Sequence, residues 1–329
     1  MPTLITPAEI ERAAALLRAG ALVAFPTETV YGLGADASNP DAVAGIFAAK
    51  GRPQDHPLIV HLASVELLPQ WAKAFPPAAQ KLAAAFWPGP LTLILERSGG
   101  VPDCVTGGQD SVGVRIPGHP VALALLRAFS GDAGARRYCG VAAPSANRFG
   151  RVSPTTAAHV RDELGDAVAG VLDGGECDVG IESTIVDVSR GRAVLLRPGQ
   201  ITPAQVAAVI GAEVELPDAD APRVPGALAS HYAPRTPLAL VPAAELAAQL
   251  AALRGKRVAV LSRAEAPGGL KDVSWQSAPR AVAGYAHELY ASLRRLDALD
   301  CVQILVETPP GTPEWQGVND RLNRAASTR

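Results

Sequence analysis

Two short motifs, far apart in the chain, carry side chains suited to holding an anion. Lys50-Gly51-Arg52-Pro53 brings two cations together, and Pro144-Ser145-Ala146-Asn147 adds two small hydrogen-bonding side chains. Lys and Arg supply charge and forked donors for phosphate or carboxylate, whereas Ser and Asn fix orientation. Taken singly, each motif is more typical of a solvated helix end or a plain turn. Together with Arg115, the set suits an anionic nucleotide.

A glycine-rich hexapeptide, Gly32-Leu33-Gly34-Ala35-Asp36-Ala37, superficially matches the G-x-G-x-x-A fingerprint of dinucleotide sites. That fingerprint requires its first glycine at the end of a strand and an acidic residue closing the next strand. Here residues 27–31 intervene, and Asp55 precedes the next apolar run at Leu58, so we interpret the glycines as turn residues. A Walker P-loop and a G-x-S-x-G pattern are also missing, so ATP chemistry needs another phosphate cradle and an acyl-enzyme serine has no support.

Other polar residues fit a site and an ordinary structural role equally well. His61 ends an apolar run, and His56 lies shortly before that run. The pair His231-Tyr232 lies in a Pro-flanked loop and fits simple packing between domains. Ser183 and Arg197 fit the start of one strand and the exit of another. Residue types alone leave these alternatives open.

Composition limits the class of protein. The 329 residues exceed what one compact core usually holds, so length favours two domains. A hydrophobic fraction of 48% and a charged fraction of 19% indicate globular rather than disordered domains. The formal net charge of −2 and a pI near 6.3 argue against a dedicated nucleic-acid binder, which normally carries a strongly basic face.

The cysteines and the N-terminus bear on metal binding and compartment. Cys104, Cys139, Cys177 and Cys301 form no C-x-x-C pair and have no histidine at metal-ligand spacing, which disfavours zinc and a disulfide framework. The N-terminal segment lacks the apolar core of a signal peptide, and no stretch reaches a bilayer's length. We therefore expect a reduced, cytoplasmic setting and no membrane partner.

Alternating helical and strand patterns predict an α/β fold. Thr6-Pro7-Ala8-Glu9 is a capping box with Pro at the first helical position, and it predicts a helix over 7–18. The apolar run 21–25, closed by Pro26, predicts a buried strand. Further helices are expected over 41–50, 78–86, 121–129, 155–164 and from Thr202, and further strands over 58–62, 91–96, 111–116 and, as a hairpin, 183–188 with 193–196.

A second domain follows a linker. Residues 217–237 are rich in Pro and Ala without a periodic pattern, so we place the linker there. From Leu238 the pattern restarts with a strand, followed by helices expected over 243–253, 281–296 and 316–326 and strands over 257–261 and 302–306. This alternation predicts a small Rossmann-like α/β domain.

The ordered motifs resemble those of threonylcarbamoyl-adenylate synthases of the YrdC-like family, in their two-domain form, over essentially the whole chain. The resemblance rests on motifs of the first domain, the linker and the second domain. They are Pro26-Thr27-Glu28-Thr29-Val30-Tyr31-Gly32-Leu33-Gly34, Lys50-Gly51-Arg52-Pro53, Pro57-Leu58-Ile59-Val60-His61, Trp87-Pro88-Gly89-Pro90-Leu91-Thr92, Val114-Arg115-Ile116-Pro117, Ala143-Pro144-Ser145-Ala146-Asn147, Glu182-Ser183-Thr184-Ile185-Val186-Asp187, Leu196-Arg197-Pro198-Gly199, His231-Tyr232-Ala233-Pro234 and Leu289-Tyr290 to Asp297.

The resemblance implies a fold and a reaction. It implies a YrdC-like twisted mixed sheet with flanking helices around a concave cavity over 1–212, a linker or lid over 213–237, and a smaller Rossmann-like domain over 238–329. The implied nucleotidyltransferase joins L-threonine, bicarbonate or CO2, and ATP with Mg²⁺ into L-threonylcarbamoyladenylate and pyrophosphate. This is the first step of tRNA N6-threonylcarbamoyladenosine formation, and the product passes to a threonylcarbamoyl transferase acting on tRNA.

The resemblance also implies roles for individual residues. The threonine site would take Thr29, His61, Arg115, Ala143 and Ser183, with Arg115 facing the carboxylate. The nucleotide site would take Lys50, Arg52, His56, Ser111, Ser145, Asn147, Ser153, Arg197, His231 and Tyr232, of which Lys50, Arg52, Ser145 and Asn147 are the expected catalytic set. No protein ligand to metal is predicted, because Mg²⁺ would travel on the ATP phosphates. Asp55-His56 departs from the Ser or Asp followed by Asn that relatives often carry.

Two other functions compete with the synthase. An RNA-binding module would use Lys50, Arg52, Arg148 and Arg151 on one concave face without turnover, although the slightly acidic charge weighs against stable nucleic-acid binding. Carbamoyl transfer of the hydrogenase-maturation type shares the YrdC-like domain but adds zinc fingers, for which this chain has no cysteine pairs.

Overall fold

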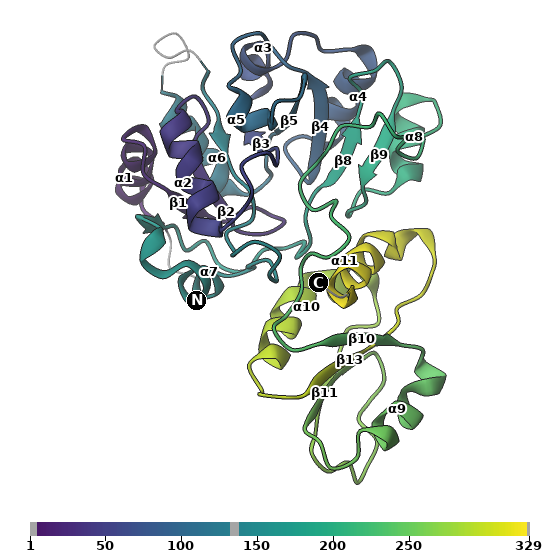
Figure 1. Ribbon diagram of the computed structural model, residues 1–329. Coiled ribbons are helices and arrows are strands. Elements are labelled where there is room, and N and C mark those ends of the chain that lie inside the picture. Colours follow the sequence, from purple (N-terminus) through teal and green to yellow (C-terminus); the bar gives the residue numbers. More distant parts are fainter. Residues whose placement is uncertain (1–4, 132–137, 328–329) are drawn as a thin grey trace.

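The computed structural model describes residues 5–131 and 138–327. Figure 1 shows two parts joined by an extended segment: a large part built around one broad sheet, and a smaller part that carries the C-terminal residues. The helices α10 (Val282–Asp297) and α11 (Gln316–Ala326) lie between the small sheet and the large part. The architecture confirms the predicted α/β fold with a large mixed sheet and a second, smaller sheet.

The large sheet has nine strands in the order β7-β1-β2-β6-β3-β5-β4-β8-β9. The pairs β3–β5, β4–β8 and β1–β7 are parallel and the other paired strands are antiparallel, so the sheet is mixed. Its strands are β1 Val23–Phe25, β2 Gly32–Asp36, β3 Ile59–His61, β4 Leu91–Glu96, β5 Ser111–Arg115, β6 Val141–Ala142, β7 Gly170–Val171, β8 Thr184–Asp187 and β9 Val194–Arg197.

Helices flank this sheet, and their ends follow the expected capping chemistry. Thr6 and Thr202 both form reciprocal capping boxes, with Glu9 and Gln205 respectively, and Gly51 ends the helix before it in a left-handed conformation (φ 61°). The helices are α1 Pro7–Arg18, α2 Pro40–Lys50, α3 Leu68–Trp71, α4 Pro77–Phe86, α5 Asp103–Thr106, α6 Pro120–Ser130, α7 Ala157–Leu164 and α8 Pro203–Ile210, with short 3₁₀ helices at Val65–Leu67 and Gly165–Ala167.

The interpretation of Gly32 and Gly34 as turn residues is wrong, because both lie in strand β2 and pair with β1. A glycine is needed at these two positions for a different reason. A Cβ at Gly34 would lie 2.8 Å from the Phe25 ring and 3.0 Å from Val141, and one at Gly32 would lie 3.2 Å from the Ala143 Cβ. Close packing of the strands against neighbouring side chains therefore explains these glycines, as expected for glycine inside a strand.

The small sheet is parallel, in the order β10-β13-β11-β12. Its strands are β10 Leu238–Val241, β11 Val258–Ser262, β12 Val273–Ser277 and β13 Gln303–Glu307. Helices α10 and α11 pack on one face of the sheet, and the short helix α9 (Leu246–Ala252) covers the other, as Figure 1 shows. The parallel sheet between helices confirms the Rossmann-like prediction, although strand β12 was not expected from the sequence.

The two parts approach each other closely at glycines. Gly180 adopts φ +80°, and a Cβ there would lie 2.4 Å from the carbonyl oxygen of Ala286 in α10. At Gly317 in α11, a Cβ would lie 2.9 Å from the carbonyl oxygen of Gly199. The second domain is therefore docked backbone against backbone on the segments before β8 and after β9.

The predicted linker, 213–237, lies between α8 and β10 and contains only isolated bridges, Val194 with Glu215 and Arg151 with Ala233. The bounds of the two domains stay a prediction, and their first and last residues, 1–4 and 328–329, lie outside the described residues. In the described ranges, no helix has the length and apolar character needed to cross a bilayer.

We expect Gly180→Ala to lower the free energy of unfolding by about 2 kcal/mol or more, because a left-handed backbone and a backbone contact both oppose the added methyl group. Gly191→Ala is the matched control, since Gly191 also has a left-handed φ of +76° but no described atom within 4 Å of its Cβ position. Urea denaturation of both variants checks this. Equal losses of stability would contradict close docking of the two parts.

Candidate active site

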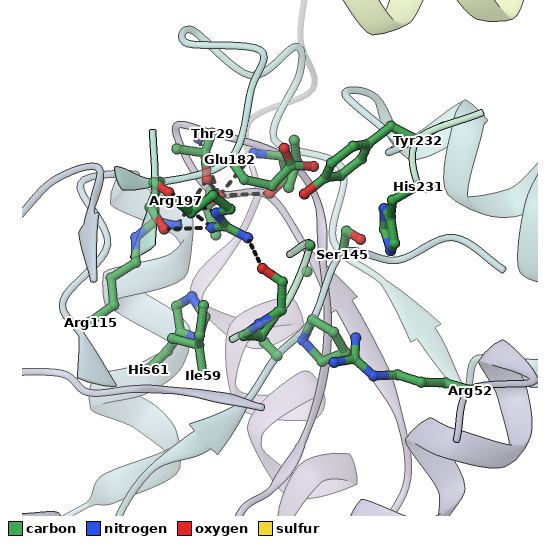
Figure 2. A pocket seen from close by; sticks show the side chains of 18 residues that line it. Thr29, Arg52, Ile59, His61, Arg115, Ser145, Glu182, Arg197, His231 and Tyr232 are labelled. Carbon is green, nitrogen blue, oxygen red and sulfur yellow. Dashed lines mark hydrogen bonds between the residues drawn. The ribbon is translucent and has the colours of Figure 1, made fainter. Parts of the chain in front are cut away.

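A small cavity of about 50 Å³ lies where the ends of several large-sheet strands, the Lys50–Pro53 region and the linker converge. Figure 2 shows the lining side chains directed into this space from both sides. Most of the residues predicted for the site line it: Thr29, Arg52, His61, Arg115, Ala143, Ser145, Ser183, Arg197, His231 and Tyr232. Folding thus brings together motifs that are widely separated in the sequence.

Five predicted residues are not among those that line the cavity: Lys50, His56, Ser111, Asn147 and Ser153. Lys50 is buried, and its Nζ donates hydrogen bonds to the carbonyl oxygens of Ser145 and Asn147, the latter at 2.6 Å. Burial, with Arg52 nearby, holds the pKa of Lys50 well below its usual range. In this arrangement Lys50 supports the loop that carries Ser145.

The side-chain contacts of the other four residues lie outside the described cavity lining, except for that of Ser153 with Glu182. Ser153 Oγ donates to Glu182 at 2.6 Å, and the Asn147 amide donates to the carbonyl oxygens of Arg148 and Arg151. His56 packs edge-on against Phe149, with ring centroids 5.4 Å apart, and Ser111 begins strand β5 opposite Glu96. Their predicted roles at the nucleotide remain predictions.

Arg115 is held rigidly at one end of the cavity. Its guanidinium forms an ion pair with Glu28 at 2.6 Å and donates to Thr29 Oγ1 at 3.0 Å and to the Gly89 carbonyl oxygen at 3.2 Å. Glu28 in turn accepts from the backbone N–H of Gly118 at 2.9 Å. Sequence reasoning did not single out Glu28, although its place in the polar segment 27–31 was a usable signal.

Arg197 joins the sheet side of the cavity to the linker. Its Nε and Nη2 donate to the carbonyl oxygen of Ser183 at 3.1 and 2.9 Å, and Nη2 also reaches Ser183 Oγ at 3.1 Å. Its Nη1 donates to the Pro225 carbonyl oxygen at 2.9 Å. The position of Pro225 is thereby tied to Ser183, the residue directly before strand β8.

Glu182 is the acidic side chain on the described cavity wall, and sequence reasoning missed its role. Burial alone would raise its pKa, but Arg321 and Arg197 outweigh burial and lower the pKa to about 2. Arg321 belongs to α11 of the second domain, so no motif in its own neighbourhood indicated this contact.

The linker covers the cavity through what we call the covering segment, residues 223–232. At one end Arg223 pairs with Asp55 at 3.3 Å and donates to the Gly107 carbonyl oxygen at 2.9 Å. At the other end His231 and Tyr232 project toward the cavity, as Figure 2 shows. Because 50 Å³ holds only a few waters, the covering segment leaves no room here for a nucleotide.

Several buried polar atoms around the cavity have no hydrogen-bond partner among the described residues: Arg52 Nε, His61 Nδ1, His231 Nδ1 and Tyr232 Oη. Buried polar groups in folded proteins nearly always have partners, so these atoms are available to the polar groups of a ligand or of water. Burial lowers the pKa of both His61 and His231 to about 3, so both imidazoles are neutral at physiological pH. Burial also lowers the pKa of Arg52, to about 10, and it remains a cation.

Comparison with known proteins identifies the family of the chain. Residues 15–199 match the family described as "Telomere recombination", and residues 201–327 match "Threonylcarbamoyl-AMP synthase, C-terminal domain". The threonylcarbamoyl-AMP synthase of Bacillus subtilis is 42% identical, over 98% of this chain and 94% of its own length. The chain belongs to the threonylcarbamoyl-AMP synthase family. Membership confirms the predicted resemblance and makes the chain an enzyme of the nucleotidyltransferase type.

Solved structures support the two-domain arrangement. The crystal structure of Pyrococcus abyssi Sua5 complexed with L-threonine superposes with a TM-score of 0.89 at 38% identity, covering 98% of this chain and 96% of that chain. The threonylcarbamoyl-AMP synthase of the same organism is 46% identical over 71% of this chain and 68% of its own length. Escherichia coli YciO matches with a TM-score of 0.51 at 22% identity, over 60% of this chain and 92% of its own, and supports the fold alone.

We predict that His61→Gln makes the free energy of unfolding depend less on pH in the acidic range. The folded pKa of His61 is depressed to about 3 from 6.5, so the unfolded chain takes up a proton first and stability falls as pH drops below about 6.5. The substitution reduces the change of unfolding free energy with pH by up to about 1.4 kcal/mol per pH unit. His231, whose pKa is lowered in the same way, still contributes a similar amount in the variant. Urea denaturation between pH 7.5 and 5 measures it. A slope equal to the wild-type slope would contradict a buried, neutral His61.

Proposed function

We propose that the protein condenses L-threonine, bicarbonate or CO2, and ATP into L-threonylcarbamoyladenylate with release of pyrophosphate, the first step of tRNA N6-threonylcarbamoyladenosine formation. The observation that carries the proposal is the cluster of unpartnered polar atoms on the cavity wall, in a chain of this family. The solved relative from Pyrococcus abyssi, described as complexed with L-threonine, supports threonine as one substrate.

The chemistry needs alignment and charge neutralisation more than a nucleophilic side chain. The threonine amine adds to CO2 to give a carbamate, and a carbamate oxygen then forms a bond to the α-phosphorus of ATP as the bond to pyrophosphate breaks. Cations that neutralise the developing phosphate charge, and walls that exclude water, lower the barrier to such a displacement. Arg52 and Arg197 lie on the cavity wall and suit this task.

The threonine end is proposed around Thr29, His61, Arg115, Ala143 and Ser183. Arg115 donates once each through Nε, Nη1 and Nη2 to described residues, so two of its five N–H groups remain for a substrate carboxylate. Its bond to Glu28 fixes the guanidinium before substrate arrives. Because His61 is neutral, it offers a hydrogen bond to substrate without repelling an ammonium group.

The nucleotide end is proposed around Arg52, Ser145 and Arg197, with Lys50, His56, Ser111, Asn147 and Ser153 behind or beside them. Lys50 and Asn147 act here mainly by holding the Ser145 loop. His231 and Tyr232 close over the bound nucleotide. The covering segment must therefore move outward to admit ATP, which makes it a lid.

The protein's own residues do not fit a protein-held Mg²⁺. Among the described residues no group of three His, Cys, Asp or Glu side chains is placed to hold a metal ion. The carboxylate of Glu182 on the described wall is already engaged by Ser153, Tyr290 and Arg321. We propose that Mg²⁺ enters with the ATP phosphates.

The product is a mixed anhydride of a carbamate and a phosphate, a class of compound that water and amines attack readily. We propose that it passes to a threonylcarbamoyl transferase acting on tRNA, and that the protein itself does not bind nucleic acid stably, given its net charge of −2. An RNA-binding module is the second candidate.

We expect the purified protein to release pyrophosphate from ATP and Mg²⁺ only when both L-threonine and bicarbonate are present. A coupled pyrophosphate assay, with each component omitted in turn, measures this. An intact protein that shows no such release, but binds tRNA with an affinity that falls steeply with salt, would favour the RNA-binding function instead.

We expect Arg52→Ala to lower adenylate formation about a hundredfold or more, because a cation facing the phosphates is lost. Arg52 is buried, and its Nη2 donates to the Pro57 carbonyl oxygen, so thermal unfolding must accompany the assay. Arg161→Ala is the control, since Arg161 pairs with Asp173 at a half-exposed position away from the cavity lining. Unchanged turnover in a folded Arg52→Ala protein would remove Arg52 from the site.

We expect Gly226→Ala to lower kcat/KM about tenfold, because a displacement of Tyr232 by about 1 Å would misalign the groups that enclose the substrates. Gly226 has φ +77°, and its Cβ would lie 2.0 Å from Tyr232 Oη, so the covering segment cannot close as observed. Gly211→Ala is matched, with φ +75° and no described atom near its Cβ position. Equal activity of the two variants would show that the observed closed arrangement plays no part in turnover.

A further inference from the structure

Two residues of the second domain reach through the domain boundary to the back of the cavity wall. Arg321 of α11 pairs with Glu182 Oε2 at 2.6 Å, and Tyr290 Oη of α10 donates to the same oxygen at 2.9 Å. Arg321 also donates to the carbonyl oxygens of Glu182 and Pro198. Neither Arg321 nor Tyr290 is among the described residues that line the cavity, and both are essentially fully buried.

The same two residues enclose Tyr232 of the covering segment. The guanidinium of Arg321 lies 5.3 Å from the Tyr232 ring centroid, and the Tyr290 ring stacks on Tyr232 with centroids 5.8 Å apart and planes 27° apart. Cation–π and stacked aromatic contacts at these distances are attractive. Tyr232 adopts φ 60°, a left-handed conformation that a tyrosine holds only when surrounding contacts stabilise it.

Through these contacts Arg321 acts both on the charge of Glu182 and on the position of Tyr232. Glu182 lines the same cavity as Arg52 and Arg197, and an unpaired carboxylate there would repel a nucleotide and compete for Arg197. Arg321 balances that carboxylate from behind, where no ligand displaces it. The face of the same guanidinium packs against the ring of Tyr232, so Arg321 contacts both Glu182 and the covering segment.

We propose that Arg321, with Tyr290, is a positioning residue for the nucleotide site. Docking of the second domain brings these two side chains to the cavity wall, where they compensate the negative charge of Glu182 and hold Tyr232 in its closed position. The second domain thus contributes to ATP binding without touching the nucleotide. This inference rests on the proposed synthase function.

Full-length Arg321→Met tests it, with Arg321→Lys as the conservative variant and Arg294→Met as the matched control. Arg294 of α10 is a partly buried cation that also crosses the boundary: it pairs with Glu163 at 3.2 Å and donates to the Ser153 carbonyl oxygen at 3.4 Å. None of these contacts involves Glu182 or Tyr232. We expect Arg321→Met to raise the KM for ATP about tenfold or more, the effect of losing a buried charged hydrogen bond. Arg321→Lys restores part of that loss, whereas Arg294→Met lowers Tm but leaves the KM within about twofold of wild type.

Equal KM values for Arg321→Met and Arg294→Met would overturn the inference, because domain docking would then act only through stability. If Arg321→Met does not fold, Tyr290→Phe takes its place, since it keeps the ring and removes only the hydroxyl that donates to Glu182. A several-fold rise in its KM for ATP supports the inference, and an unchanged KM overturns it.

A failure of the proposed function itself is recognisable separately. In that case the wild-type protein shows no threonine-dependent pyrophosphate release. Hydrogen exchange of the 226–232 amides then still reports on the contact: faster exchange in Arg321→Met than in Arg294→Met supports the positioning role, and equal exchange overturns it.

Discussion

A buried carboxylate at a junction of two domains must be compensated, and the compensation of Glu182 organises much of this molecule. Its oxygens accept hydrogen bonds from Ser153 of the first domain and from Tyr290 and Arg321 of the second. Removing one partner of such a buried pair costs far more than a surface ion pair contributes. The two domains therefore dock in one relative position near the cavity, and the glycine contacts at Gly180 and Gly317 allow that approach.

The closed cavity follows from the same arrangement. Arg197 ties Pro225 to the strand that begins after Ser183, while Arg321 and Tyr290 hold Tyr232 from the other side. The covering segment consequently occupies most of the space in which we place ATP. The polar atoms that lack partners around it are the cost of an enclosed site shaped for ligand groups, and bound substrates would satisfy them.

Local signals predicted much of the fold. Capping boxes at Thr6 and Thr202 and a terminal glycine at Gly51 determine helix ends through contacts within a few residues, and the structure confirms them. Gly32 and Gly34 were misread because the side chains that leave no room for a Cβ, Ala143 at Gly32 and Phe25 and Val141 at Gly34, are brought close only by strand pairing. Strand β12 was missed because it is an edge strand with half-buried residues and therefore shows no strong apolar run.

The candidate site was predictable in its residue types and family motifs, but less so in its contacts. Arg52, Arg115 and Arg197 line the cavity, whereas Lys50 donates hydrogen bonds to the loop that carries Ser145. Glu182 and Arg321 lie far apart in the chain, and only the tertiary fold reveals that they pair.

The central claim is that threonine and nucleotide share this one cavity once the covering segment moves. A crystal structure of the full-length protein with L-threonine and a non-hydrolysable ATP analogue tests it most directly. We predict both ligands in the cavity, threonine near Thr29 and Arg115 and phosphates near Arg52, with residues 223–232 displaced from their position here. Either ligand bound elsewhere, or a cavity still filled by an unmoved covering segment, would contradict the account.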